Sequence, residues 1–273
     1  MSRRALPSLL ALSLALASSS AVATERAFVY AEQSPVLLAG SAELEPWTTL
    51  SVGRERYYNE LAGRLGLRRG MLHALQLSLF WSFETRTRDV VVDDLTGRLG
   101  RVSESELSGA SLQAKYQLSD PVLDLVGSAV LLETTVGPSK SELAANLAFD
   151  RALNRLLLVA NVATSYRLIP TRTDDGSELE TSFVLEPRLG ASWTLPAGFR
   201  AGLELRAPFG LAGVDDSAAL FGGPALGWAG DRFWATLGAL PQLIAFSNKS
   251  PGSRLDLSEH ERLELRLLAG FLL

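Results

Sequence analysis

The last residues of the chain alternate between apolar side chains and charged or small ones. The apolar parity is Leu263, Leu265, Leu267, Ala269, Phe271 and Leu273, and Glu264, Arg266 and Gly270 occupy the other parity. A β-strand points successive side chains to opposite faces of its sheet. One face of this segment is therefore wholly apolar and the other charged, so the two sides of its sheet must meet two different solvents.

The same alternation recurs along the chain in about twelve segments of about ten residues, the pattern of a transmembrane β-barrel. The segments are 42–52, 57–67, 74–84, 110–118, 126–136, 142–150, 156–167, 183–193, 201–206, 220–228, 233–243 and 262–273. No segment with a helical period competes with them. The pattern predicts an all-β fold, a transmembrane antiparallel up-and-down β-barrel. A soluble periplasmic β-sandwich is the alternative, because its strands also alternate.

The first residues have the form of a secretory signal peptide. Arg3 and Arg4 precede a short apolar run, 9–17, and the small residues of 21–23 form a cleavage site. We therefore expect a signal peptide at 1–23, a periplasmic lead-in or lumen segment at 24–40, and the barrel at 41–273. A disordered leader is the alternative for 24–40. No later segment has eighteen unbroken apolar residues, which argues against a helical membrane protein.

The connections alternate between short turns and longer polar stretches, as expected for periplasmic turns and extracellular loops. The predicted turns are 68–70, 119–121, 151–155, 196–198 and 229–231, and the predicted long loops are 87–106, 169–178, 208–217 and 246–259. Aromatic residues fall at segment ends, as in the two interfacial belts of a barrel. The predicted belt residues are Tyr57, Trp81, Phe83, Tyr116, Phe149, Tyr166, Phe183, Trp193, Trp228 and Phe271.

Charged residues of both signs lie on the parity that would face the lumen. This predicted charge ladder comprises Glu43, Glu45, Glu60, Arg64, Glu84, Arg86, Lys115, Glu133, Glu142, Arg167, Glu186, Arg188, Glu204, Arg206, Glu264 and Arg266. Three pairs spaced two apart, 186/188, 204/206 and 264/266, have the right parity for ion pairs. A salt-bridge ladder that fills the barrel is one interpretation, and a narrow pore for small polar solutes is the other.

A family resemblance rests on several short motifs: Gly40 with Glu43, Glu45 and Trp47; Tyr57-Tyr58; Gly222-Gly223-Pro224 ahead of Trp228 and Trp234; and the ending at 262–266. Together they resemble a family of uncharacterised Gram-negative outer-membrane barrels. The resemblance covers most of the mature chain and implies location in the bacterial outer membrane. It supplies no catalytic residues. Phe271 and Leu273 would form the C-terminal assembly signal.

Sites for chemistry are scarce. Ser258 and His260 have the reverse order of the His-x-Ser of outer-membrane phospholipases, and His73 has no fixed partner. No cluster of Cys, His and carboxylates has transition-metal spacing. The acidic stretches at 93–94 and 174–176 could bind Ca²⁺, but acidic loop tips are usually only solvated, and no cofactor is expected. The net charge of −4 gives no nucleic-acid footprint.

The sequence therefore predicts a non-enzymatic barrel, either a narrow passive channel or a structural barrel for small polar solutes. A closed surface-binding barrel with a salt-bridged lumen is the alternative, and a lipid-active enzyme is a weaker one. The expected partners are outer-membrane lipid and the barrel-assembly machinery. The oligomeric state is left open.

Overall fold

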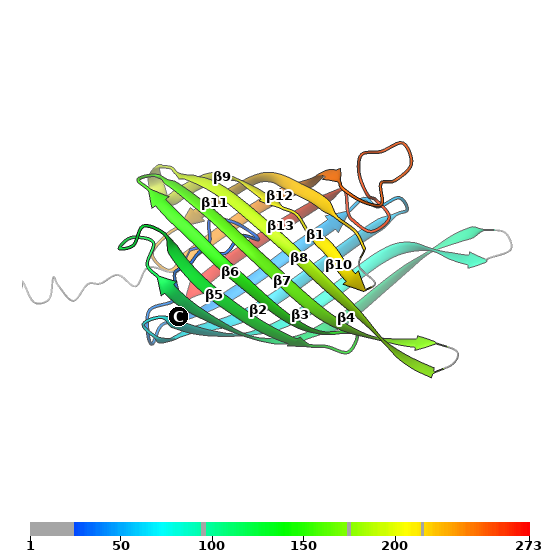
Figure 1. The fold of residues 1–273 in the computed structure, drawn as a ribbon, viewed down its shortest axis with the longest axis horizontal. Coiled ribbons are helices and arrows are strands. Elements are labelled where there is room, and N and C mark those ends of the chain that lie inside the picture. Colours follow the sequence, from blue (N-terminus) through cyan, green and yellow to red (C-terminus); the bar gives the residue numbers. More distant parts are fainter. Residues whose placement is uncertain (1–24, 94–96, 174–175, 214–215) are drawn as a thin grey trace, which may run out of the picture.

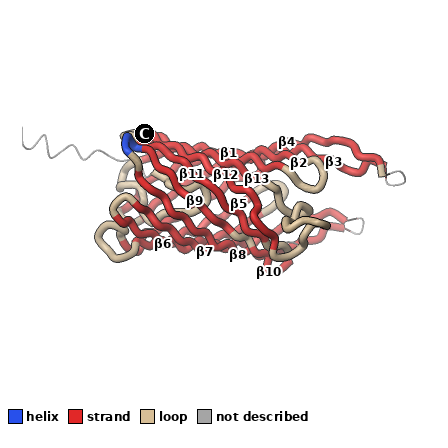
Figure 2. The backbone as a smooth tube through the Cα atoms, turned by 90° about the horizontal axis from the view of Figure 1, so that it is seen from above, coloured by secondary structure: helices blue, strands red, loops and turns tan. Residues whose placement is uncertain are grey.

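A computed structural model describes residues 25–93, 97–173, 176–213 and 216–273. The signal peptide predicted at 1–23 lies outside them. Nearly all of the wall is strand (Figure 2). The elements are β1 (Ala42–Val52), β2 (Tyr58–Leu72), β3 (Leu75–Asp93), β4 (Arg98–Ser119), β5 (Gly127–Val136), β6 (Ser141–Leu153), β7 (Leu156–Thr173), β8 (Gly176–Thr194), η1 (Pro196–Gly198), β9 (Phe199–Arg206), β10 (Phe209–Gly213), β11 (Ala219–Ala229), β12 (Phe233–Ala245) and β13 (Leu263–Leu272).

The strands form one closed antiparallel sheet. Each pairs with its neighbour, and β1 pairs with β13, from Glu43 opposite Leu272 to Val52 opposite Leu263. β9 and β10 both pair with β8 and are parts of one strand, interrupted at 207–208. Pro208 has no N–H to donate there. The wall therefore has twelve strands, so the predicted fold class and strand number are confirmed, and closure pairs the first strand of the wall with the last.

The two faces of the wall differ as the alternation predicts. Large apolar side chains on the outer face, such as those of Leu112, Leu189 and Leu203, are exposed. Polar and charged side chains point to the inner face, where several, such as those of Gln76 and Glu204, are buried. An outer face of this kind suits hydrocarbon, and the inner face suits water or paired charge. Among the described residues, no helix is long and apolar enough to cross a membrane.

The two ends of the barrel differ in their connections. At one end, the turn end, short connections join the strands, and β1 begins and β13 ends there (Figure 1). At the other, the hairpin end, the β3–β4 and β7–β8 hairpins project beyond the wall (Figures 1 and 2). The predicted belt aromatics are exposed on the outer face, except Phe183, which is half-buried beside β10.

Three of the long loops predicted at the hairpin end are wrong in their secondary structure. β3 and β4 continue through most of 87–106, β7 and β8 through most of 169–178, and β10 occupies part of 208–217. The β3–β4 extension carries polar pairs on one face, Thr85 with Ser105 and Thr87 with Ser103, each 3.0 Å apart. Without an apolar face, such a ribbon lacks the alternation by which the other strands were recognised.

The turn predicted at Arg68-Arg69-Gly70 is also wrong, because β2 continues to Leu72. Gly70 is required there for a different reason. Its backbone pairs with Ala39, and a Cβ at Gly70 would lie 2.2 Å from the carbonyl oxygen of Leu38. The glycine therefore allows another segment of backbone to cross the inner wall, and Arg68 lies on the inner face within a strand.

Candidate functional site

Residues 25–38, which we call the lumen segment, lie inside the barrel near the turn end, where Figure 1 shows them in dark blue. Phe28, Val29, Ala31 and Leu37 are each at most 1% exposed. The segment forms no strand and enters β1 through Gly40, whose φ of 87° is readily adopted by glycine. The inside of this half of the barrel is therefore filled by the chain itself.

Side chains of the wall bind the backbone of the lumen segment. Glu204 on β9 accepts hydrogen bonds from the backbone N–H groups of Val29, Tyr30 and Ala31, at 3.0, 2.8 and 2.5 Å. Asn161 on β7 accepts from the N–H of Glu32 at 2.6 Å and donates to its carbonyl at 2.9 Å. Buried backbone groups need such partners when no strand supplies them.

The contacts of the lumen segment run around the wall. Gln76 on β3 accepts from Leu37 N, Asp150 on β6 accepts from Ser34 N, and Lys115 on β4 donates to the Gln33 carbonyl. Thr236 on β12 donates to the Arg26 carbonyl, and Tyr30 donates its hydroxyl to Glu264 on β13. The wall therefore holds the segment from several strands.

Apolar side chains inside the barrel also hold the segment. Val29 and Tyr30 pack in a buried cluster with Phe221, Trp234 and Leu268 of the wall. Phe28 lies against β8 at Gly190, where an added Cβ would come within 2.7 Å of the Phe28 ring. This internal core was not predicted from the sequence. The Gly-rich β11 and β12 concealed it, although the lumen parity of Trp234 and Phe221 was a readable signal.

Buried charges in this half are arranged in groups. Arg68 donates to Glu43 at 2.9 Å and to Glu45 at 2.6 Å, with all three side chains at most 4% exposed. Glu32 of the lumen segment lies 3.0 Å from Arg26 and 3.8 Å from Lys115. Burial alone raises the pKa of Glu32, but these cations, with Arg68 and Arg188, outweigh it and lower the pKa to about 2. The segment is thus also held by charge.

The other half of the lumen is a cavity of about 530 Å³, which we call the vestibule. Arg26, Val29, Tyr30 and Glu32 of the lumen segment contribute to its lining, and residues at the hairpin end, such as Lys140, line it too. Ion pairs within strands and between strands line this cavity. They are Glu60–Arg86 and Glu84–Arg86, Glu133–Arg64, Glu142–Arg167, and Glu186 with Arg188 and Arg206.

Every residue of the predicted charge ladder lies in the lumen, but the partners differ from two of the three predicted pairs. Arg188 pairs with Glu186 at 2.6 Å. Arg206 instead binds Glu264 at 2.5 Å and Glu186 at 3.2 Å. Glu204 binds backbone N–H groups of the lumen segment, and Arg266 donates to Thr49. The ion-pair partners on other strands depend on the register of the sheet and on the position of the lumen segment. The spacing of residues within one strand gives no information on either.

Ser258 and His260 lie in the connection between β12 and β13. The Ser258 hydroxyl donates to Asp256 at 2.7 Å, and the His260 ring makes an edge contact with Phe221. Burial lowers the pKa of His260. Within the described part of the chain, no hydrogen bond joins Ser258 to His260, and no cluster of His, Asp and Glu could hold a metal. The geometry therefore offers no activated nucleophile at this position.

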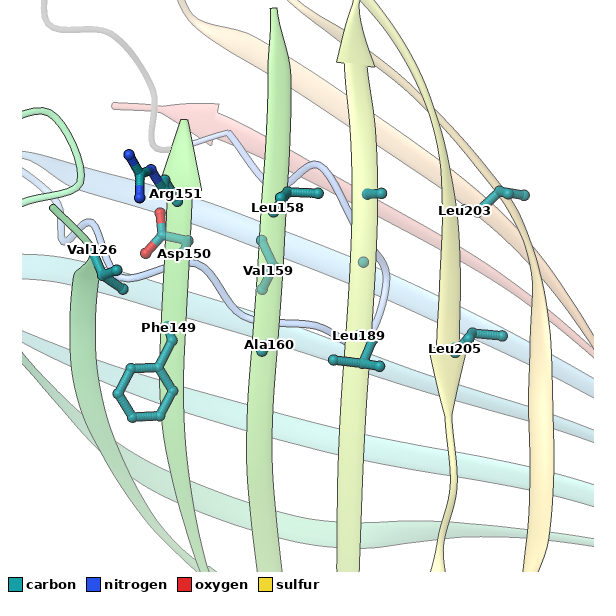
Figure 3. A pocket seen from close by; sticks show the side chains of 12 residues that line it. Val126, Phe149, Asp150, Arg151, Leu158, Val159, Ala160, Leu189, Leu203 and Leu205 are labelled. Carbon is teal, nitrogen blue, oxygen red and sulfur yellow. The ribbon is translucent and has the colours of Figure 1, made fainter. Parts of the chain in front are cut away.

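A hollow of about 470 Å³ on the outer wall is apolar (Figure 3). It forms where Ala160 and Ala191 lie among the larger Leu158, Leu189 and Leu203. These leucines are exposed on the outer face. The hollow can accommodate hydrocarbon, and its lining offers little with which to recognise a polar solute.

The terminal strand completes the wall. The Phe271 ring lies 4.7 Å from that of Phe233, and both rings are at the turn end of the outer face. The N–H of Leu273 donates to the carbonyl of Ala42 at 2.9 Å. The last residues thus close the sheet against its first strand.

The fold is similar to several solved barrels, at low sequence identity. The COG4313 outer membrane channel from Pseudomonas putida F1 aligns over 88% of this chain and 98% of its own, with a TM-score of 0.63 and 11% identity. The β domain of the Bordetella autotransporter BrkA aligns over 86% of this chain and 100% of its own, with a TM-score of 0.52 and 12% identity. The NanC porin aligns over 84% of this chain and 100% of its own, with a TM-score of 0.51 and 10% identity. No protein with a curated description matches.

These likenesses establish an outer-membrane type of barrel fold. A family model matches residues 20–273, nearly the whole chain, and its description agrees with the resemblance found in the sequence. The chain belongs to the family of unknown function DUF6662.

Proposed function

We propose that this protein is a narrow, non-enzymatic channel of the bacterial outer membrane for small polar solutes, closed at rest by its lumen segment. The apolar outer face and the resemblance to outer-membrane barrels support the location. The vestibule offers polar solutes a charged path through half of the barrel. In this orientation the turn end faces the periplasm and the hairpin end faces the exterior.

The observation that carries the proposal is how the lumen segment is held. It is bound by wall side chains such as Glu204 and Asn161, and its backbone meets the sheet only near its end, where Ala39 pairs with Gly70. Movement of 25–38 about Gly40 would break none of the hydrogen bonds between strands. The segment can therefore leave the lumen while the wall stays intact.

The closed state is favoured in the resting protein. Complete burial of side chains such as Phe28 and Leu37 contributes roughly 2 kcal/mol each, and the hydrogen bonds to Glu204 add to this because they are charge-assisted. The free energy of docking must be overcome before a solute passes. Spontaneous openings are thus expected to be rare and brief.

Planar-bilayer conductance tests the proposal. The refolded wild-type protein is compared with a variant that lacks residues 25–38 and with Arg232→Gln, an exposed substitution in a turn, as the matched control. We expect rare openings from wild type and the control, and frequent or sustained conductance from the deletion variant. Heat-dependent gel mobility verifies that each barrel has folded. A folded deletion variant that never conducts would show that the channel proposal is wrong.

One observation favours a second function, that of a surface-binding barrel. The β3–β4 hairpin projects beyond the wall and carries hydrogen-bonded pairs such as Thr87–Ser103, so it is an ordered surface at the exterior end. A barrel that never conducts but binds a soluble partner through this hairpin would support it. Removal of residues 87–104 should then abolish binding and leave the melting temperature of the wall unchanged.

A further inference from the structure

Arg266 is a lumen cation without a carboxylate partner. It lies on β13 opposite Thr49, to whose hydroxyl its Nε donates at 2.7 Å. Among the described residues, no carboxylate oxygen lies within 4.0 Å of its guanidinium, and its Nη atoms have no hydrogen-bond acceptor. Arg266 is half-buried, and cations inside a protein are normally paired, so this exception calls for a ligand or a structural reason.

The other charges of the vestibule make the exception clear. Each carboxylate that lines the cavity is paired with a cation, for example Glu133 with Arg64 and Glu142 with Arg167. Of the lining cations in the described structure, only Arg266 and Lys140 are unpaired. Lys140 lies in the β5–β6 turn at the hairpin end, and Arg266 lies within the wall. The vestibule therefore has one cation without an ion pair at its mouth and one inside it.

Two aromatic rings hold the Arg266 guanidinium. Its central carbon lies 3.7 Å from the ring centre of Tyr30, on the lumen segment, and 4.4 Å from that of Trp47, on β1. Tyr30 is itself fixed by the 2.8 Å hydrogen bond from its hydroxyl to Glu264. Stacking restricts the side chain and leaves the N–H edge of the fork for an acceptor.

We propose that the vestibule contains an anion-binding position at Arg266, for small solutes that carry a carboxylate or phosphate group. The inference rests on the proposed function, since the vestibule is the outer half of that channel. A planar guanidinium with a free edge matches two oxygens of one oxyanion better than it matches chloride or a neutral hydroxyl. A cavity of about 530 Å³ has room for a small organic acid.

Isothermal titration of the full-length refolded protein tests this position. Sodium gluconate and inorganic phosphate are the probes, glucose is the neutral analogue of gluconate, and sodium chloride keeps the ionic strength constant. We expect both anions to bind and glucose not to bind. Arg266→Gln should weaken anion binding by about tenfold or more, the loss expected for one charge-assisted hydrogen-bonded contact. Arg266→Lys keeps the positive charge but not the planar fork of N–H donors, so its anion affinity should lie between those of wild type and Arg266→Gln.

The matched control is Arg64→Gln, which removes one positive charge from a cation of the same vestibule that is already paired. Its effect should stay within about threefold, because Glu133 rather than the solute uses that charge. Equal losses in the Arg64 and Arg266 variants would show that only net charge matters. That result, or equal binding of gluconate and glucose to the wild-type protein, would overturn the proposal even if a variant fails to fold.

Binding and conductance fail independently. If the protein binds gluconate through Arg266 but never conducts, the anion site is supported and the channel proposal is wrong. If the variant without the lumen segment conducts but the wild-type protein binds neither anion, the channel proposal is supported and the anion site is wrong.

Discussion

The two halves of the lumen contain the same kinds of charged residue in different surroundings. Towards the turn end, Arg68, Glu43 and Glu45 are at most 4% exposed, and Arg26 of the lumen segment lies 3.8 Å from Glu45. In the vestibule, Arg167 and Glu142 keep 33% and 23% of their side-chain surface. A charge removed from water is stabilised only by its protein partners, whereas a hydrated charge is stabilised by solvent as well. The same residue types should therefore have very different energetic roles.

Arg68→Ala should have the largest effect. It leaves Glu43 and Glu45 close together, buried and without their shared cation, at a cost of about 3–5 kcal/mol in the free energy of unfolding. Urea unfolding in lipid, followed by tryptophan fluorescence, measures the loss. The triple variant Glu43→Gln, Glu45→Gln, Arg68→Met should recover much of it. If Arg68→Ala is as stable as wild type, the turn-end half is hydrated and the contrast between the halves is wrong.

Glu204→Ala should release the lumen segment and leave the wall folded. Three buried N–H groups, those of Val29, Tyr30 and Ala31, lose their acceptor, each at about 1–3 kcal/mol. Hydrogen exchange of 26–38 should rise steeply, and the amides between strands should stay protected. Glu204→Gln, which keeps one acceptor oxygen, should have an intermediate effect. Unchanged exchange in the Ala variant would mean that Glu204 does not hold the segment.

Acid should loosen the segment through Glu32. Its pKa is about 2 in the docked state and near 4.5 when free, so docking retains the full contribution of Glu32 above about pH 4.5. That contribution, on the order of 3 kcal/mol, falls as the pH drops from about 4.5 towards 2. Opening frequency in bilayers should therefore rise over this range. Glu32→Gln should open more often at neutral pH and lose this part of the pH dependence; an unchanged profile would contradict the assignment.

Glu142→Gln should have the smallest effect. The Glu142–Arg167 pair, 2.8 Å long, is partly hydrated, so its loss should cost no more than about 1 kcal/mol of unfolding free energy. The same urea titration used for Arg68→Ala makes the two values directly comparable. A cost equal to that of Arg68→Ala would remove the distinction between the two halves.

The sequence predicted the wall far better than its contents. Alternation fixes which residues face outward, and the predicted first strand, 42–52, has the observed bounds. The position of 24–40 stayed open because the segment has no period, and its partners are scattered over strands distant in sequence. Arg68 was missed because Gly70 has the form of a turn residue. The role of Glu204 depends on backbone N–H groups, which side-chain patterns do not show.

A disulfide that locks the lumen segment to the wall tests the central claim most directly. A Cβ built at Gly238 would lie 2.5 and 3.1 Å from the two Cγ atoms of Val29, so Val29→Cys with Gly238→Cys places two thiols within bonding reach. The chain has no cysteine of its own. We predict that the oxidised double variant gives no openings and that dithiothreitol restores them. Dithiothreitol should leave the openings of the two single variants unchanged. An oxidised, fully cross-linked variant that conducts like the reduced one would contradict closure by the lumen segment.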